Sequence, residues 1–131
     1  MILVIGATGN IGSEVTRQLV AKGVGVRALV RDRAKAEAVL GTKVQLVAGD
    51  LSRPETVAAA MGGADKLFLV TPLHLDQIAM KSAAIQAAKL AGVKHIVMST
   101  GIGAGPDAGV EIGRWHGKNQ EEVKATGIAY T

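Results

Sequence analysis

Three glycines near the start of the chain have the spacing of a phosphate-binding turn. Gly6, Gly9 and Gly12 follow an apolar run at residues 2–5, and an amphipathic helical pattern begins at Ile11. The first N–H groups of a helix have no partner within it, and the helix dipole favours an anion, so we expect a pyrophosphate site here. The alternative is an ordinary strand-to-helix turn in which the glycines are incidental. The residues expected at the phosphates are Gly6, Thr8, Gly9, Asn10, Ile11 and Gly12.

The end of the second predicted strand should select the dinucleotide. Arg31 follows residues 24–30, at the place where the adenosine ribose of a bound dinucleotide would lie. An arginine favours the 2'-phosphate of NADP, whereas an acidic side chain accepts a hydrogen bond from the free 2'-hydroxyl of NAD. We therefore expect NADP(H) rather than NAD, and Asp32 is the residue that would favour NAD instead.

The third predicted strand ends in a second group for the adenosine half. Asp50 and Leu51 follow residues 43–48, so Asp50 could bond the adenine amino group while Leu51 packs on the ring. Asp50 could equally belong to the loop that leads to Ser52, which has the position of a helix cap. The sequence leaves these two interpretations open.

The fourth and fifth predicted strands bring groups to the nicotinamide side. Thr71 and Pro72 lie within residues 70–73, which end the fourth strand, although a proline here is also typical of a helix-entry turn. Ser99 ends the fifth strand, where its hydroxyl could bind a substrate carbonyl or orient it for hydride attack. His116 faces inward on the last predicted helix, where a histidine more often packs than reacts. Ser99 and His116 are the candidate catalytic residues.

Strands and helices alternate along the whole chain, so we expect one domain spanning residues 1–131. The fold class is α/β: a Rossmann-type, doubly wound parallel sheet in the order 3-2-1-4-5, with the start of a sixth strand and helices on both faces. The expected strands are 2–5, 24–30, 43–48, 66–70 and 95–99, with a sixth starting at 128–131. The expected helices run from the glycine turn to about 22, from the Ser52 cap to 61, and over 34–40, 75–91 and 114–126.

Composition excludes several functional classes. The net charge is +4, but the 15 lysines and arginines are dispersed and aromatic residues make up only 2%, so we expect no nucleic-acid partner. No apolar run approaches the roughly 20 residues of a membrane helix, and we expect a cytoplasmic protein with no membrane partner. The absence of cysteine excludes disulfides and thiolate sites, and the three histidines lack metal-ligand spacing. Any redox chemistry therefore belongs to an organic cofactor.

These motifs together resemble the NmrA-like branch of the atypical short-chain dehydrogenases, in particular its bacterial NAD(P)H quinone oxidoreductases. The resemblance implies that the glycine turn holds the pyrophosphate, that Arg31 holds the 2'-phosphate and that the segment around Ser99 borders the nicotinamide. It implies hydride transfer from NADPH to a quinone or a similar small acceptor. The motifs are GATGNIG (6–12), VRDRAKA (30–36), AGDLSRPETVAAAM (48–61), AAKLAGVKHIVMST (87–100) and HGKNQEEVKATGIAYT (116–131).

The chain departs from the family pattern in two ways. His116 and Gln120 stand at the spacing of the Tyr-x-x-x-Lys pair of ordinary short-chain dehydrogenases, so the usual proton donor is absent. This departure keeps open a second function: a non-catalytic module that senses the NAD(P) redox state and acts through a protein partner. Family members also continue past the sixth strand into a region that walls the substrate pocket. We expect either a truncated chain or a homodimer in which a second subunit completes the sheet.

Overall fold

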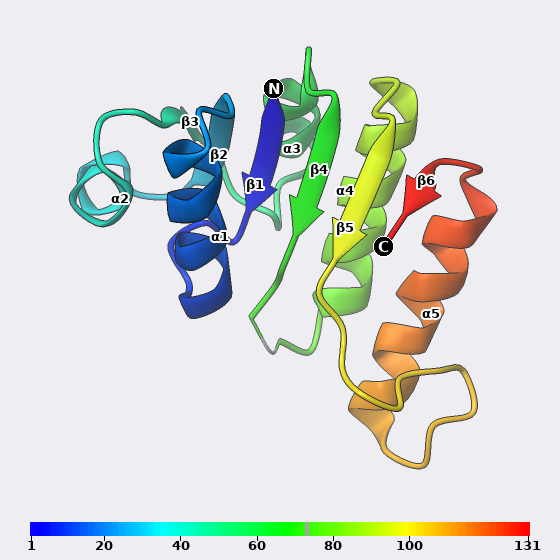
Figure 1. Cartoon of the computed structure of the whole chain (residues 1–131). Coiled ribbons are helices and arrows are strands. Elements are labelled where there is room, and N and C mark those ends of the chain that lie inside the picture. The colour runs from blue at the N-terminus through cyan, green and yellow to red at the C-terminus, as the bar shows by residue number, and fades with distance from the viewer. Residues whose placement is uncertain (73) are drawn as a thin grey trace.

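Six parallel strands form a single sheet in the computed structural model, which describes residues 1–72 and 74–131. The strand order is β3-β2-β1-β4-β5-β6, which confirms the predicted Rossmann-type sheet (Figure 1). Leu73, expected at the end of the fourth strand, lies outside the described residues. The elements are β1 (Ile2–Ile5), α1 (Asn10–Ala21), β2 (Val26–Val30), α2 (Arg33–Leu40), β3 (Gln45–Ala48), α3 (Pro54–Met61), β4 (Lys66–Leu69), α4 (Gln77–Leu90), β5 (His95–Met98), α5 (Glu111–Ala125) and β6 (Ala129–Tyr130).

The central strand β1 is apolar because both of its faces are covered. Leu3 and Ile5 point into the core that α3, α4 and α5 share with the sheet. Val4 points the opposite way, into the core beneath α1 and α2. All three side chains are at most 2% exposed, as expected for the middle of a doubly wound sheet. Because all the strands are parallel, their carboxyl ends lie at one edge of the sheet, where loops lead to the following helices (Figure 1).

The glycine turn joins β1 to α1 with very little space between the two. Gly6 has φ +83°, and a Cβ atom on it would lie 2.2 Å from the carbonyl oxygen of Val70. A Cβ atom on Gly12 would lie 2.1 Å from the carbonyl oxygen of Gly6. Both contacts are with backbone, which has little freedom to move. These two glycines therefore allow the first turn of α1 to pack directly against the end of β1.

The expected Ser52 helix cap is wrong. The N-cap of α3 is Arg53, which makes no side-chain capping bond, and Pro54 is the first helical residue. Ser52 is instead part of a local turn: its amide and its hydroxyl both donate to Oδ1 of Asp50, over 2.8 and 2.7 Å. Because the carboxylate of Asp50 binds both donors of Ser52, the helix begins one residue later.

Two other helices begin two or more residues away from their predicted starts. Helix α5 begins at Glu111, three residues before the predicted start, and α4 begins at Gln77 rather than at residue 75. Glycine-rich composition suggested a loop up to residue 113, but Gly113 is buried within the first turn of α5. A Cβ atom there would lie 2.7 Å from Cβ of Ala108, so the absence of a side chain permits close packing.

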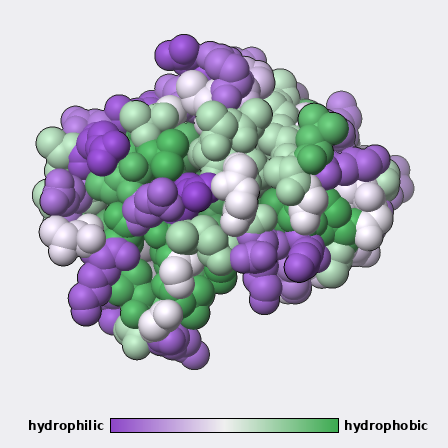
Figure 2. Space-filling model, turned by 90° about the horizontal axis from the view of Figure 1, so that it is seen from above, coloured by the Kyte–Doolittle hydropathy of each residue, from purple (hydrophilic) through white to green (hydrophobic). Residues whose placement is uncertain are grey.

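The face at the amino ends of the strands lies opposite the edge where the polar loops gather. Figure 2 looks onto this face and shows broad hydrophobic areas, with hydrophilic side chains among them and toward the edges. Within the described part of the chain, no helix combines the length and the apolar character that a membrane crossing requires. The loops that bring together the residues of a possible site lie at the carboxyl ends of the strands.

Replacing Gly12 with alanine tests the close packing of α1. Alanine normally favours a helix over glycine, but here its Cβ atom would overlap the backbone of Gly6. We expect the G12A variant to lose about 1 to 3 kcal/mol of unfolding free energy in urea titrations. The neighbouring S13A variant is the control and should change by less than about 0.5 kcal/mol. An equally stable G12A variant would contradict the packing.

Candidate active site

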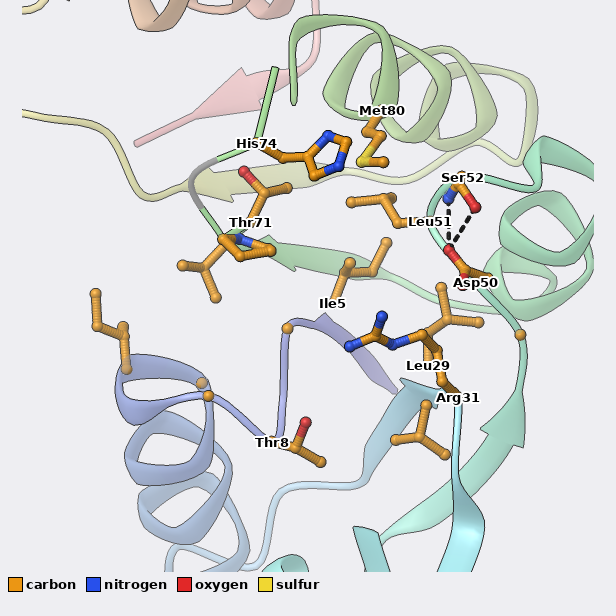
Figure 3. A pocket seen from close by; sticks show the side chains of 18 of the residues that line it. Ile5, Thr8, Leu29, Arg31, Asp50, Leu51, Ser52, Thr71, His74 and Met80 are labelled. Carbon is orange, nitrogen blue, oxygen red and sulfur yellow. Dashed lines mark hydrogen bonds between the residues drawn. The ribbon is translucent and has the colours of Figure 1, made fainter. Parts of the chain in front are cut away.

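A cavity of about 770 Å³ lies at the carboxyl ends of β1, β2, β3 and β4 (Figure 3). It is lined by every residue that the sequence nominated for the dinucleotide. These are Gly6, Thr8, Gly9, Asn10, Ile11, Gly12, Arg31, Asp50, Leu51, Thr71 and Pro72. They come from four different strand ends, so the fold brings together residues that are distant in the sequence. Their individual roles toward a ligand remain predictions.

The amino end of α1 has the properties of an anion site. The N-cap, Gly9, makes no side-chain capping bond, and the amide of Ser13 is the one that donates to the carbonyl oxygen of Gly9, over 2.9 Å. The amides of residues 10–12 therefore have no partner inside the helix. Among the described residues, a Cβ atom on Gly9 would come within 4 Å of the carbonyl oxygen of Gly6 alone, at 3.4 Å. The space in front of the turn is thus open to a phosphate group.

The charged groups of the cavity favour an anion near Arg31. Arg31 is exposed and points into the cavity from the end of β2 (Figure 3). Asp32, the residue that would have favoured NAD, caps α2 instead: its carboxylate accepts from the amide of Lys35 over 3.0 Å. Asp32 does not line the cavity. The available group at this strand end is therefore a cation.

Asp50 accepts hydrogen bonds within its loop and also lines the cavity. Hydrogen bonds from the amide and hydroxyl of Ser52 hold the pKa of the Asp50 carboxyl below its usual range, and the charge of Arg31 lowers it further. Its own amide donates to Oγ1 of Thr56 over 3.0 Å, which fastens the loop to α3. The loop interpretation from the sequence is therefore confirmed, while contact of Asp50 with an adenine remains a prediction.

The opposite end of the cavity is mainly apolar. Ile5, Val70 and Met80 line it together with Thr71 and Pro72, and the exposed His74 and Asp76 also belong to the lining. The hydroxyl oxygen of Thr71 is buried and has no hydrogen-bond partner among the described residues. A ligand with a polar edge and an aromatic face would suit this end, because the hydroxyl could bond the edge while the apolar side chains cover the face.

Ser99 and His116 do not line this cavity, but they lie beside it and close to each other. The amide of Ser99 donates to the carbonyl oxygen of Leu69 over 2.9 Å, which places Ser99 next to the end of β4. Lys81 joins the two candidates. Its Nζ atom lies 3.3 Å from the carbonyl oxygen of Ser99 and 3.1 Å from Nδ1 of His116.

Lys81 was missed by the sequence prediction, although a signal was present. It lies on α4 at helical spacing from Gln77, Ala84, Ile85 and Ala88, all of which are buried. A lysine on this otherwise buried stripe is unusual, because a buried ammonium requires compensation. The side chain is 1% exposed. Burial lowers the pKa of Lys81 to about 8.

Helix α5 contributes His116 to the cluster that it forms with Ser99 and Lys81. Burial, together with the charge of Lys81, lowers the pKa of His116, so its imidazole is mostly neutral at pH 7. Gln120 does not replace the lysine of the missing Tyr-x-x-x-Lys pair near His116: its amide donates to Oγ1 of Thr100 over 3.2 Å. Asn119 is buried and donates to the carbonyl oxygen of Ile78 over 3.2 Å. The cluster therefore sits between two helices that are tied to each other.

Known proteins resemble this chain along its whole length. The model of the NAD(P)H-binding family matches residues 6–131. An NAD(P)H azoreductase from Xenophilus azovorans is 58% identical over 131 residues, which are all of this chain and 46% of that protein. The chain thus spans slightly less than half the length of this relative.

Solved structures of reductases share the fold. The triphenylmethane reductase of Citrobacter sp., complexed with NADP(H), superposes with a TM-score of 0.85 at 29% identity, over 98% of this chain and 47% of that one. An NADPH-dependent quinone oxidoreductase from Escherichia coli, complexed with NADPH, gives 0.84 at 27% identity, over 99% and 47%. Together with the family match and the glycine turn, these findings show that the chain belongs to the NAD(P)H-binding family of the NmrA-like superfamily.

Proposed function

We propose that this chain is the NADP(H)-binding part of a reductase that transfers a hydride from NADPH to a small conjugated acceptor such as a quinone or an azo compound. The observation that carries the proposal is the cavity itself, which joins an uncapped helix terminus, an arginine and an apolar end in one groove. When bound, the cofactor supplies the hydride. The residues of the chain supply binding, orientation and protons.

The cavity offers a suitable group for each part of the proposed cofactor. The amides of residues 10–12 would bind the pyrophosphate, and the open space at Gly9 lets the phosphates approach the backbone. Arg31 would pair with the 2'-phosphate, which NAD lacks. Leu51 would pack on the adenine. The nicotinamide would lie at the apolar end, where the buried hydroxyl of Thr71 has a free position for its carboxamide.

The acceptor would lie beyond the nicotinamide, near Ser99 and His116. Ser99 follows β5, and His116 belongs to α5. Ser99 bonds the end of β4, next to the apolar end of the cavity. The names of the relatives support a conjugated acceptor, because an azoreductase, a triphenylmethane reductase and a quinone oxidoreductase are among them. Hydride addition to such an acceptor leaves an anion that needs a proton. A hydroxyl and an imidazole are suitable groups to stabilise and protonate it.

Charge reversal at Arg31 tests the choice of cofactor. Loss of charge-assisted hydrogen bonds to a phosphate costs about 1.5 to 3 kcal/mol, so the R31E variant should bind NADPH roughly 10- to 100-fold more weakly. NADH binding should be unchanged or stronger. Calorimetric titration with both cofactors measures the difference. R33E is the control, because Arg33 lies outside the cavity lining and both affinities should be retained. Equal losses for NADPH and NADH in R31E would refute the assignment.

A valine at Gly9 separates cofactor binding from folding. Gly9 has extended backbone angles that valine adopts readily, and its Cβ position is nearly free of contacts. We therefore expect G9V to keep its stability within about 0.5 kcal/mol. The new side chain would fill the phosphate space, so affinity for both NADPH and NADH should fall by at least roughly tenfold.

The same variant tests whether the chain takes part in catalysis. Oxidation of NADPH in the presence of a simple quinone, followed by the loss of NADPH absorbance, should occur in the unmodified protein and be lost in G9V. Tight NADPH binding with no turnover of quinones or azo dyes would contradict the reductase proposal. It would favour the redox-sensing module that the missing Tyr-x-x-x-Lys pair leaves open.

A further inference from the structure

The lysine between α4 and α5 is buried without an acidic partner among the described residues. Lys81 is 1% exposed, and its ammonium contacts the carbonyl oxygen of Ser99 and the Nδ1 ring nitrogen of His116. An unpaired buried ammonium disfavours folding, so a purely structural role is a poor explanation for it. An apolar residue of similar length would fill the same space at lower cost.

The carboxylates of Glu122, Glu121 and Asp76, on or next to the surrounding helices, contact groups other than Lys81. On α5, the carboxylate of Glu122 accepts from the hydroxyl of Ser82 and from Nε2 of Gln86. Before α4, the exposed Asp76 faces His74, 3.7 Å away. The elements β4 and β5 contribute the backbone near Ser99. Among the described residues, His116 is therefore the titratable group that Lys81 contacts.

This contact determines which ring nitrogen of His116 carries the proton. The ammonium of Lys81 is a donor only, so Nδ1 of His116 must accept and must itself be unprotonated. Neutral His116 then carries its proton on Nε2. Nε2 has no hydrogen-bond partner in the described part of the chain, and it is not fully buried. The adjacent Cδ2 atom lies 3.8 Å from the position that a Cβ atom on Gly101 would take. The N–H group is thus available to a ligand beside Gly101.

We propose that Lys81 is a positioning residue that fixes His116 in the Nε2–H form and supplies a proton to Nδ1 when Nε2 gives its own proton to the acceptor. This inference rests on the proposed reductase function for its catalytic meaning. Its structural content, the tautomer and the Lys81–His116 coupling, stands independently of that function. In the Tyr-x-x-x-Lys pair the lysine follows the proton donor by four residues. The residue at that position here, Gln120 on α5, bonds Thr100, so the cation beside His116 would be Lys81 on α4.

The proposed transfer is balanced. A cofactor held by the glycine turn and Arg31 would supply a hydride to the acceptor, which would leave NADP⁺ and an acceptor anion. The Nε2 proton of His116 moves to this anion, and a proton from the Lys81 ammonium enters at Nδ1, which leaves a neutral amine. A proton from water then binds Nε2, and the Nδ1 proton returns to Lys81. One proton from water is consumed in each cycle. The lowered pKa of Lys81, about 8, makes its proton available for this step near neutral pH.

Nuclear magnetic resonance of His116 tests the coupling without any turnover. In the unmodified protein we expect the Nε2–H tautomer from the ring nitrogen shifts, and a His116 pKa below that of an ordinary histidine. The K81M variant removes the neighbouring charge, so the His116 pKa should rise and the tautomer should become mixed. K81R retains the donor and should preserve the tautomer. K89M, at an exposed position of the same helix, is the control and should change neither quantity.

Two results would overturn the inference. An Nδ1–H tautomer in the unmodified protein would do so without any variant, even if K81M failed to fold. A His116 pKa that is the same in folded K81M and in the unmodified protein would show that the two groups are not coupled.

Kinetics then test the catalytic meaning of the coupling. With a quinone acceptor, K81M should lower kcat roughly 10- to 100-fold with an unchanged KM for NADPH. The decline in rate above pH 8, where Lys81 loses its proton, should be absent in K81M. An unchanged kcat and pH profile in K81M would overturn the relay. Absence of quinone turnover in the unmodified protein, with the expected magnetic resonance result, would instead refute the proposed function and leave the coupling intact.

Discussion

The unpartnered amides at the amino end of α1 are the constraint on which the rest of the site depends. The helix begins without a capping side chain, and its first turn packs against β1 so closely that only glycine fits at positions 6 and 12. An anion in front of this turn satisfies the amides and the helix dipole together. The strand order places the ends of β2, β3 and β4 around the same point, so Arg31, Asp50 and Thr71 surround whatever binds there.

The sequence predicted the residues that line the cavity well because local patterns determine them. Glycine spacing, strand ends and a following helix define the turn, and the parallel topology then fixes which strand ends are neighbours. The helix starts at Ser52 and at Arg114 were wrong for tertiary reasons. Asp50 bonds both donors of Ser52, and Gly113 packs against Ala108, neither of which a one-dimensional pattern records.

The cluster of Ser99, Lys81 and His116 was predicted only in part. Ser99 and His116 were nominated from their strand end and helix position, but the group that joins them lies on α4, 18 residues before Ser99. Lys81 stands on a buried helical stripe, and only the packing of α4 against α5 shows that its head group meets His116. The chain spans about half the length of its relatives, and the proposed proton supply is the part of the acceptor chemistry that involves residues of this chain.

Amide shift mapping with two halves of the cofactor tests the central claim most directly. Adenosine 2',5'-bisphosphate should shift the amides of Arg31 and Asp50, and nicotinamide mononucleotide those of Thr71 and Ser99. Intact NADP⁺ should shift both sets and, most strongly, the amides of residues 10–12, since these would bind its pyrophosphate. Unshifted amides at residues 10–12 in the presence of saturating NADP⁺ would contradict the account.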